Sequence, residues 1–458
     1  MAAVGVDPAH GVTASTSPYT DEGWNVINAR DLVMFGSWAT DDWRMYILNF
    51  PFSALEAAWM AAVGVGIVQA RLLVIACGAV ALGTLGIGLR RQLGGAGASL
   101  ATAALAGSAL LLYYGRLAYL EPLVMLWLIA ALTLLARVRP SLATGIVAGI
   151  ALALAIATKA SAGFAAAGLL GGVALAGWRD GEVRRAVLGA LLGLLAAALA
   201  WAIVFAVPSP AALATDLRIW APEPLPHSAA EVVRRITSYA SRSDGGIPLA
   251  LPLLLAGAGG LLVVLVRHAE LTAEQRRLAA ASAGWFVVGM GVLLVVPYRP
   301  NRYLVPLLPP LAVLAGLGFA LLVRRAGERR LLATAGGLAL AVALVAPGVV
   351  LQLGWATATP STLPAVQARI AALVPAGSVI QGDLAPVLAM QARATTIVSR
   401  PATNVNPGDL YETRGVRWVL TAGPAPQWAA LHPAAWAART RELCVSWGPG
   451  ETCLYRLP

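Results

Sequence analysis

The sequence predicts a mainly α-helical, polytopic membrane protein that carries a small α/β domain at its C-terminal end. Hydrophobic residues make up 59% of the 458 residues and charged residues only 12%, a composition outside the range of soluble globular proteins. Apolar runs of about the length of a membrane span recur from residue 71 to residue 352. From residue 353 onward Pro, Gln, Thr and Trp become more frequent, and short β-like runs appear.

Residues 1–70 precede the first long apolar run, and we expect them to form an extracytoplasmic loop that carries the acidic pair Asp21-Glu22. Within this segment, residues 51–67 are apolar but are interrupted by Glu56. Such a run suits an interfacial helix or a half-buried hairpin better than a full span, because a charged side chain inside the bilayer is costly.

Residues 71–352 are expected to form a transmembrane domain of about ten spans, some of them close to the short limit for crossing a bilayer. The ten apolar runs lie at 71–89, 98–115, 122–136, 141–158, 161–178, 186–207, 248–266, 278–296, 303–323 and 331–352.

The connections between these runs alternate in charge, and five of them are rich in arginine. By the positive-inside rule these five are cytoplasmic, which places residues 1–70, the long loop 208–247 and the tail 353–458 outside. The net charge of +11, carried almost wholly by arginine, is then topological charge, and no basic run interleaved with aromatic residues indicates nucleic-acid binding.

The N-terminus also falls outside with no span ahead of it. Either a first span is missing, which we favour, or a short N-terminus is translocated without one.

The tail from residue 353 to residue 458 is expected to be a small soluble α/β domain on the outer face. Its helical stretch and strand candidates are 364–373, Val379-Ile380, Thr395–Val398 and Val416–Leu420. Cys444 and Cys453 flank a sequence at 447–450 that is typical of a hairpin turn, so they could face each other across two short strands. A disulfide bridge there requires an oxidising compartment. Cys77 lies within a span and is expected to be inert packing.

Carboxylates near the outer membrane face are candidates for catalysis. Asp21 and Glu22 are adjacent, so we expect only one of them to point into a cleft and the other to make structural contacts; both could also simply be solvated. Glu121 precedes Pro122 at the start of a span, where a carboxylate also suits helix capping. Arg116 would supply positive charge nearby.

Cations on the same face are candidates for binding a phosphate. Lys159 is the only lysine in the chain, and its compact ammonium suits a phosphate contact, although it could equally extend to the lipid headgroups. Arg302 and Tyr303 end a basic, aromatic outer turn that begins at Tyr298 and includes Arg299. The loop 208–247 resembles a lid or a substrate-binding segment and carries Asp216, Arg218, Trp220, Glu223, His227, Arg234, Arg235, Arg242 and Asp244.

No cofactor is expected from these patterns. The four histidines have no metal-ligand spacing, and although Asp21, Glu22 and Glu121 could hold a hard divalent cation, nothing in the sequence demands one. The chain also has no Walker-type or dinucleotide glycine motif. An outward-facing transferase without a nucleotide must therefore take an activated donor that is already in the membrane.

These features together resemble the GT-C class of polytopic glycosyltransferases, in particular the branch of protein O-mannosyltransferases and the aminoarabinose transferase of lipid A. The resemblance covers most of the chain, in order, through motifs that are each weak alone. They are Asp21-Glu22 followed by Trp24, the proline-containing run 51–67 leading to Arg71, Arg116 to Glu121, Thr158-Lys159, and Arg302-Tyr303 with Pro306, Pro309 and Pro310. The family's first span is absent, and the second acidic position is Glu121 rather than the commoner aspartate.

The resemblance implies an inverting transfer of a sugar from a polyprenyl-phosphate donor to a hydroxyl of a lipid, glycan or protein acceptor, at the outer face of the plasma membrane. In that reaction Asp21 would be the general base, Lys159, Arg302 with Tyr303, and Arg116 would bind the leaving phosphate, and Glu121 would orient the acceptor or the sugar. Two alternatives remain: a transporter or flippase of a lipid-linked envelope precursor, and an envelope assembly factor that acts through its C-terminal domain.

Overall fold

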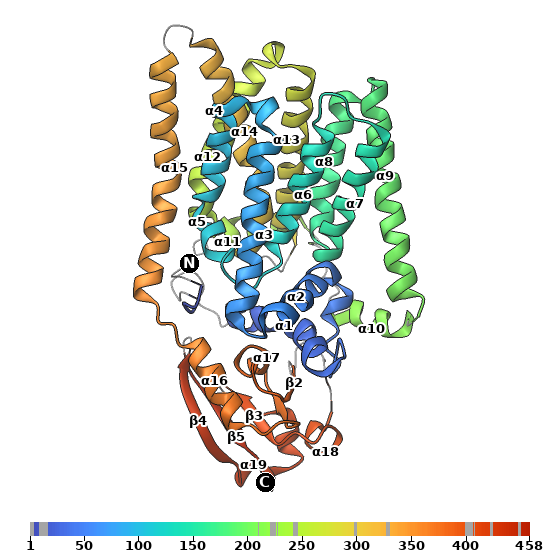
Figure 1. Cartoon of the computed structure of the whole chain (residues 1–458), viewed down its shortest axis with the longest axis vertical. Helices are drawn as coiled ribbons and strands as arrows, with labels where there is room; N and C mark the ends of the chain where they lie inside the picture. The colour runs from blue at the N-terminus through green and yellow to red at the C-terminus, as the bar shows by residue number, and fades with distance from the viewer. Residues whose placement is uncertain are drawn as a thin grey trace.

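The structure is a computed structural model that describes residues 4–8, 17–208, 210–219, 226, 228–240, 246–296, 300–326, 330–398, 406, 408–421, 425–447 and 450–458. A bundle of long helices forms one end of the molecule, and a small sheet with short helices forms the other (Figure 1). Two further helices, α1 (Ser17–Phe35) and α2 (Phe50–Val63), lie between the bundle and the sheet.

The bundle follows the hydropathy pattern, because a helix satisfies its own backbone hydrogen bonds within the bilayer. Six helices of the described chain are long and apolar enough to cross a membrane, which makes the protein a multi-pass membrane protein. The bundle helices are α3 (Ile67–Gly88), α4 (Arg90–Ala106), α5 (Ala109–Tyr114), α6 (Glu121–Leu135), α7 (Leu142–Thr158), α8 (Ala162–Gly177), α9 (Gly181–Trp201), α12 (Gly246–Val266), α13 (Ala273–Val295), α14 (Leu308–Arg325) and α15 (Arg330–Ala358).

One of the ten expected spans is not a continuous helix. The run 98–115 is divided between α4 and α5 at Gly107-Ser108, where Ser108 takes an extended conformation. The chain passes very close to α15 at this break: a Cβ atom at Gly107 would lie 2.5 Å from the Cα atom of Val345, and one at Gly348 would lie 1.9 Å from the carbonyl oxygen of Gly107. Small residues allow this approach, as is common between membrane helices.

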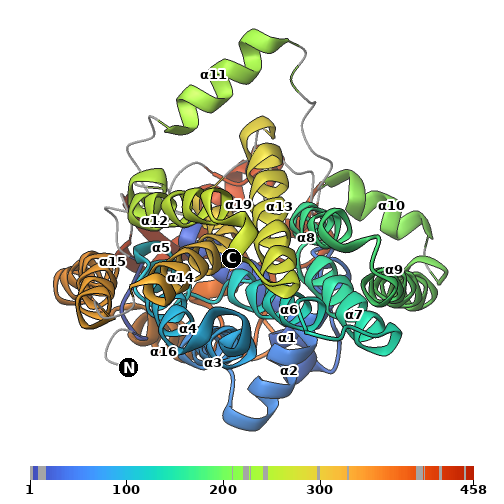
Figure 2. The same cartoon turned by 90° about the horizontal axis from the view of Figure 1, so that it is seen from above.

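The centre of the bundle is α14, which packs against α4, α12, α13 and α15 (Figure 2). Its N-terminal extension η5 (Asn301–Leu307) contains Pro306, and Pro309 and Pro310 follow in the first turn of α14. In the segment Asn301–Arg325, 89% of the most apolar window is buried inside the protein. Arg302 therefore lies at the end of the most enclosed helix of the bundle.

Within the segment expected to form an extracytoplasmic loop, the acidic pair lies on a helix. Asp21 and Glu22 belong to the second turn of α1, whose sequence lacks a regular apolar stripe. The helix is stabilised instead by burial between α2 and the C-terminal domain: Val26, Ile27 and Ala29 are completely buried, and α1 packs on α17 (Ala385–Leu388). Tertiary packing of this kind commonly outweighs weak intrinsic helix propensity.

Most of the run 51–67 lies in a helix, α2, and a helix was one of the two structures expected for this run. Helix α2 packs against α1, α3 and α7 after a short 3-10 helix, η2 (Met45–Ile47). Glu56 does not interrupt it. The side chain is completely buried, neither carboxyl oxygen has a hydrogen-bond partner among the described residues, and burial raises the pKa of this carboxyl well above its usual value.

The C-terminal region contains a five-stranded mixed sheet in the order β2-β1-β3-β5-β4. Strand β1 pairs in parallel with β2 and β3, whereas β5 pairs antiparallel with β3 and β4. The strands are β1 (Val379–Gln381), β2 (Thr395–Ile397), β3 (Trp418–Thr421), β4 (Thr440–Trp447) and β5 (Gly450–Arg456), and the helices are α16 (Leu363–Leu373), α17, α18 (Leu410–Thr413) and α19 (Pro433–Ala437). Cys444 and Cys453 face each other across β4 and β5 and form the expected disulfide.

Candidate functional site

Four charged side chains from four different elements meet where the bundle ends and α1 begins. They are Asp21 on α1, Glu121 at the start of α6, Lys159 just after α7 and Arg302 in η5, and we call them the junction cluster. An Nη1 atom of Arg302 lies 2.6 Å from Oδ2 of Asp21, and its Nε lies 3.7 Å from Oε1 of Glu121. Lys159 forms an ion pair with the same Glu121 oxygen.

Local structure places three of these side chains, those of Glu121, Lys159 and Arg302, at an element's end, and Asp21 lies in the second turn of α1. Glu121 and Pro122 open α6, and the completely buried Thr158 closes α7 by donating its hydroxyl to the carbonyl oxygen of Leu154. Lys159 then leaves the helix in an extended conformation. Elements that are far apart in the sequence thus bring their charged side chains to one point.

The cluster is nearly enclosed, and its charges balance. Glu121 is 1% exposed, and the side chains of Asp21, Lys159 and Arg302 are 12–13% exposed. Burial, the largest influence, lowers the pKa of Lys159 to about 8, while Glu121 acts in the opposite direction. Two carboxylates thus stabilise two cations that face an apolar bundle, and those cations are suited to an anionic ligand.

Two tyrosines form the walls of the cluster. The ring of Tyr303 lies 3.9 Å from Nζ of Lys159, and the guanidinium of Arg302 lies 5.4 Å from the ring centre of Tyr119. Tyr119 is 1% exposed, and its hydroxyl has no hydrogen-bond partner among the described residues. Burial, followed by the nearby charge of Asp21, raises the pKa of Tyr119 well above its usual value, so the phenol stays a hydrogen-bond donor.

Glu22 belongs to a second network, in which its main partner is Arg71. Its two carboxylate oxygens each accept a 2.7 Å hydrogen bond from Arg71, and both side chains are completely buried. The backbone amide of Ala118 also donates to Glu22, at 2.8 Å. Glu22 therefore fixes α1 to α3 and to the 115–120 turn that leads to Glu121, while its neighbour Asp21 faces Arg302.

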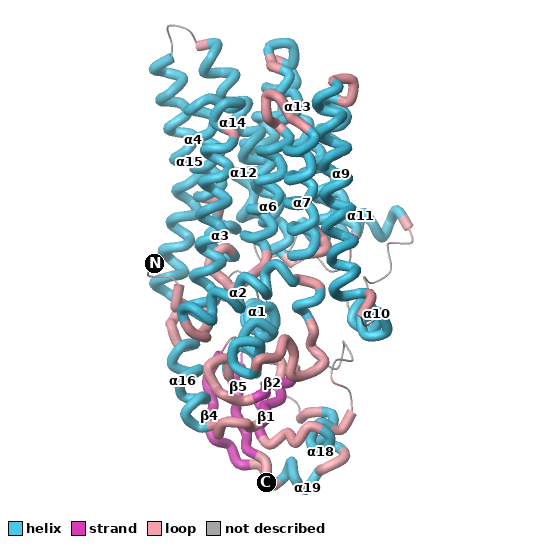
Figure 3. The backbone as a smooth tube through the Cα atoms, turned by 45° about the vertical axis from the view of Figure 1, so that its right-hand side comes forward, coloured by secondary structure: helices cyan, strands magenta, loops and turns pink. Residues whose placement is uncertain are grey.

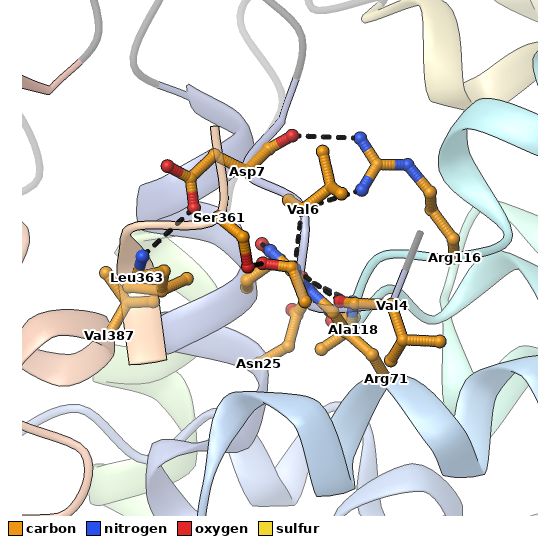
Figure 4. A network of polar contacts seen from close by, with 12 residues as sticks. Val4, Val6, Asp7, Asn25, Arg71, Arg116, Ala118, Ser361, Leu363 and Val387 are labelled. Carbon is orange, nitrogen blue, oxygen red and sulfur yellow. Dashed lines mark hydrogen bonds and ion pairs between the residues drawn. The ribbon is translucent and has the colours of Figure 1, made fainter. Parts of the chain in front are cut away.

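Arg116 belongs to this second network. It donates to the backbone carbonyl oxygens of Val6 and Asp7 at 2.8 and 3.0 Å, and Arg71 donates to those of Val4 and Val6. Figure 4 shows the two guanidinium groups on opposite sides of this N-terminal segment. These hydrogen bonds hold Arg116 against the N-terminal segment, and its role as a phosphate ligand stays a prediction.

The N-terminal segment 4–8 also holds the C-terminal domain. The carboxylate of Asp7 accepts hydrogen bonds from the backbone amides of Thr362 and Leu363, at 3.2 and 3.1 Å, at the start of α16. The hydroxyl of Ser361 donates to the carbonyl oxygen of Gly5 at 2.6 Å (Figure 4). A carboxylate at a helix N-terminus satisfies amides that have no partner within the helix.

The remaining sequence candidates are only partly described. Tyr298, Arg299 and most polar side chains of the loop 208–247 lie outside the described residues, which include two helices of this loop, α10 (Pro210–Ile219) and α11 (Ala229–Ala240). Within the described chain, the one grouping of three potential metal ligands is Cys444, Glu451 and Cys453, and its two cysteines are joined to each other in the disulfide.

Sequence reasoning missed two residues that matter here. Tyr119 lies two positions before Glu121, and its proximity to a predicted site carboxylate was the available signal. Asp7 carried no such signal, because its partners are backbone amides more than 350 positions away.

The fold is that of the GT-C polytopic membrane glycosyltransferases. Structures of ArnT from Cupriavidus metallidurans, one in the apo state and one bound to undecaprenyl phosphate, each match with a TM-score of 0.65 at 18% identity and cover 99% of this chain and 95% of theirs. The oligosaccharyltransferase AglB from Archaeoglobus fulgidus, in complex with an inhibitory peptide and a dolichol-phosphate, matches with a TM-score of 0.53 at 13% identity, covering 89% of this chain and 65% of AglB. No protein-family profile and no curated protein sequence matches the chain.

Proposed function

We propose that this protein is a membrane glycosyltransferase that moves a sugar from a polyprenyl-phosphate donor to an acceptor hydroxyl. The observation that carries the proposal is the junction cluster, in which two carboxylates and two cations from separate elements meet within a GT-C fold. The similar ArnT and AglB structures contain undecaprenyl phosphate and dolichol-phosphate, respectively. A lipid phosphate needs cations at the membrane boundary, which is where Lys159 and Arg302 lie.

The extracytoplasmic face of the plasma membrane is the proposed site of reaction. The junction cluster lies at the end of the bundle that faces the C-terminal domain, and that domain holds the disulfide between Cys444 and Cys453. Disulfides persist in oxidising compartments and are rare in the cytosol. The arginine-rich connection that follows α3 and the arginine-rich C-terminal end of α14 lie at the opposite end of the bundle (Figure 1).

In the proposed reaction the phosphate of the donor binds Lys159 and Arg302, with Tyr303 beside the ammonium. The acceptor oxygen attacks the anomeric carbon from the face opposite the phosphate, so the configuration inverts. Asp21 takes the proton from the acceptor hydroxyl as the new C–O bond forms, and the bond to the phosphate oxygen breaks with its electrons left on that oxygen. The two cations stabilise the developing charge on the phosphate.

The other two carboxylates have supporting roles in this proposal. Glu121 pairs with both cations and so holds them in position before the donor arrives; it also lies within reach of the sugar or acceptor hydroxyls. Glu22 keeps α1 in place through Arg71 and Ala118, and this makes it a positioning residue for Asp21. The acceptor is a lipid, glycan or protein of the cell envelope.

The test is sugar transfer in nanodiscs that contain the purified protein. Radiolabelled polyprenyl-phosphate sugars and envelope acceptors are supplied to the parent and to Asp21→Asn, which keeps an oxygen able to accept from Arg302 but cannot act as a base. We expect turnover to fall by roughly 100-fold or more. Asp42→Asn is the matched control, because Asp42 is an exposed acid of the same N-terminal region that pairs with Arg414 at the surface.

Two outcomes would contradict the proposal. Transfer that survives Asp21→Asn unchanged removes Asp21 as the base. Absence of transfer with every donor, together with movement of a lipid-linked precursor between leaflets in the same nanodisc lipids reconstituted as vesicles, would favour a flippase instead.

A further inference from the structure

Helix α11 (Ala229–Ala240) is amphipathic, and part of its apolar side is exposed. At about 100° per residue, Val232, Val233 and Ile236 fall within one arc of about 120°, while Arg234 falls on the opposite side. Val233 is 59% exposed and Ile236 is 37% exposed. The described chain leaves both side chains largely or partly exposed, and exposed apolar side chains grouped on one helix face commonly mark an interaction surface.

The helix lies beside the bundle and not beneath it. Seen along the bundle axis, α11 lies outside the ring of spans (Figure 2), and seen from the side it runs across that axis (Figure 3). Its contact with the bundle is with α13, where an Nη1 atom of Arg235 donates to the carbonyl oxygen of Val295 at 2.5 Å. The same Arg235 is paired with Glu231 on α11 itself.

The contact with Val295 fixes the depth of α11 in the membrane. Val295 is the last residue of α13, a 23-residue helix that begins with the arginine-rich cytoplasmic connection and is about 35 Å long. Because the hydrocarbon core is about 30 Å thick, Val295 lies at the opposite boundary of the bilayer. The exposed apolar surface of α13 includes Val287, which is 63% exposed, two turns before this boundary.

We infer that α11 lies in the headgroup region of the outer leaflet, with Val233 and Ile236 against the lipid and Arg234 toward water. The apolar side of α11 therefore contacts the lipid bilayer, which at this depth surrounds the exposed sides of the spans. An interfacial helix of this kind buries its apolar side a few ångströms below the headgroups and keeps its charged side hydrated. The inference does not depend on the proposed transferase activity.

The test places a fluorescent thiol label at Val233→Cys and, as the matched control, at Arg234→Cys. The chain suits this design, because Cys77 is buried and Cys444 and Cys453 are joined in a disulfide. Each labelled protein is placed in nanodiscs and quenched either by lipids that carry a nitroxide on an upper acyl carbon or by aqueous iodide. A thermal melt of each variant confirms that it is folded.

We expect the ratio of lipid quenching to iodide quenching to be at least about threefold higher at position 233 than at position 234. Equal ratios, with both labels quenched mainly by iodide, would show that α11 is fully hydrated and would overturn the inference. A label at 233 that is protected from both quenchers would overturn it as well, because a protein surface would then cover the face.

Discussion

Replacing the two members of the acidic pair one at a time should separate chemistry from positioning. Asp21→Asn is expected to abolish most of the turnover with little effect on stability, because the amide oxygen still accepts from Arg302 at the partly exposed end of the cluster. Glu22→Gln is expected to reduce stability first. It leaves the guanidinium of Arg71 completely buried without its charge partner, and removing one member of such a pair costs about 3–5 kcal/mol.

The assay pairs denaturant unfolding in micelles with turnover in nanodiscs for the parent, Asp21→Asn, Glu22→Gln, Arg71→Met and the double variant Glu22→Gln with Arg71→Met. Because Arg71 donates two hydrogen bonds of 2.7 Å to Glu22, the effects of the two substitutions on the free energy of unfolding should be non-additive by about 2–3 kcal/mol. The reasoning fails if Glu22→Gln keeps the parent's stability and loses turnover, because Glu22 and not Asp21 would then be the reacting carboxylate.

Four further predictions follow from single features. Affinity for the phosphodiester donor should weaken by about tenfold per pH unit above pH 8, because the ammonium of Lys159 is present below its pKa of about 8 and is lost above it. The Kd of the donor, measured from pH 6.5 to 9.5, should lose this pH dependence in Lys159→Arg, since a guanidinium stays charged over that range. Tyr119→Phe should lower turnover about tenfold without loss of stability, and unchanged turnover would mean that its hydroxyl has no ligand. Reducing the disulfide of Cys444 and Cys453 should destabilise the C-terminal domain by about 3 kcal/mol, read from its unfolding with and without reductant. Asp7→Ala should speed amide hydrogen exchange in the first turn of α16, with a loss of about 1 kcal/mol; unchanged exchange would show that Asp7 is not its cap.

The bundle could be predicted from the sequence because lipid imposes a simple rule. A segment within the bilayer must be apolar and must satisfy its own backbone, so hydropathy and length suffice to find it. The same reasoning grouped the site residues: once the arginines assigned the connections to two sides, Asp21, Glu121, Lys159 and Arg302 fell on one face, and the structure brings them into contact.

Features that depend on tertiary packing could not be predicted. The helical state of α1 depends on burial against α2 and α17, and its own sequence has no clear apolar stripe. The contacts of Arg71 and Arg116 were equally hidden, because backbone carbonyl oxygens of residues 4–7 accept the hydrogen bonds and every residue type has such an oxygen. Sequence can indicate that an arginine is buried and paired, but it cannot name a backbone partner.

The N-terminal segment that Arg71 and Arg116 hold has a consequence for how the protein is made. Residues 4–8 are synthesised before all of these partners, which are in α3, in the turn before α6 and at the start of α16, the last of them more than 350 residues later. Contacts between segments so far apart form late, after the intervening elements are in place. These contacts between the bundle and the C-terminal domain are therefore completed only after the start of α16 has been made and translocated, so chains shorter than that would lack the junction.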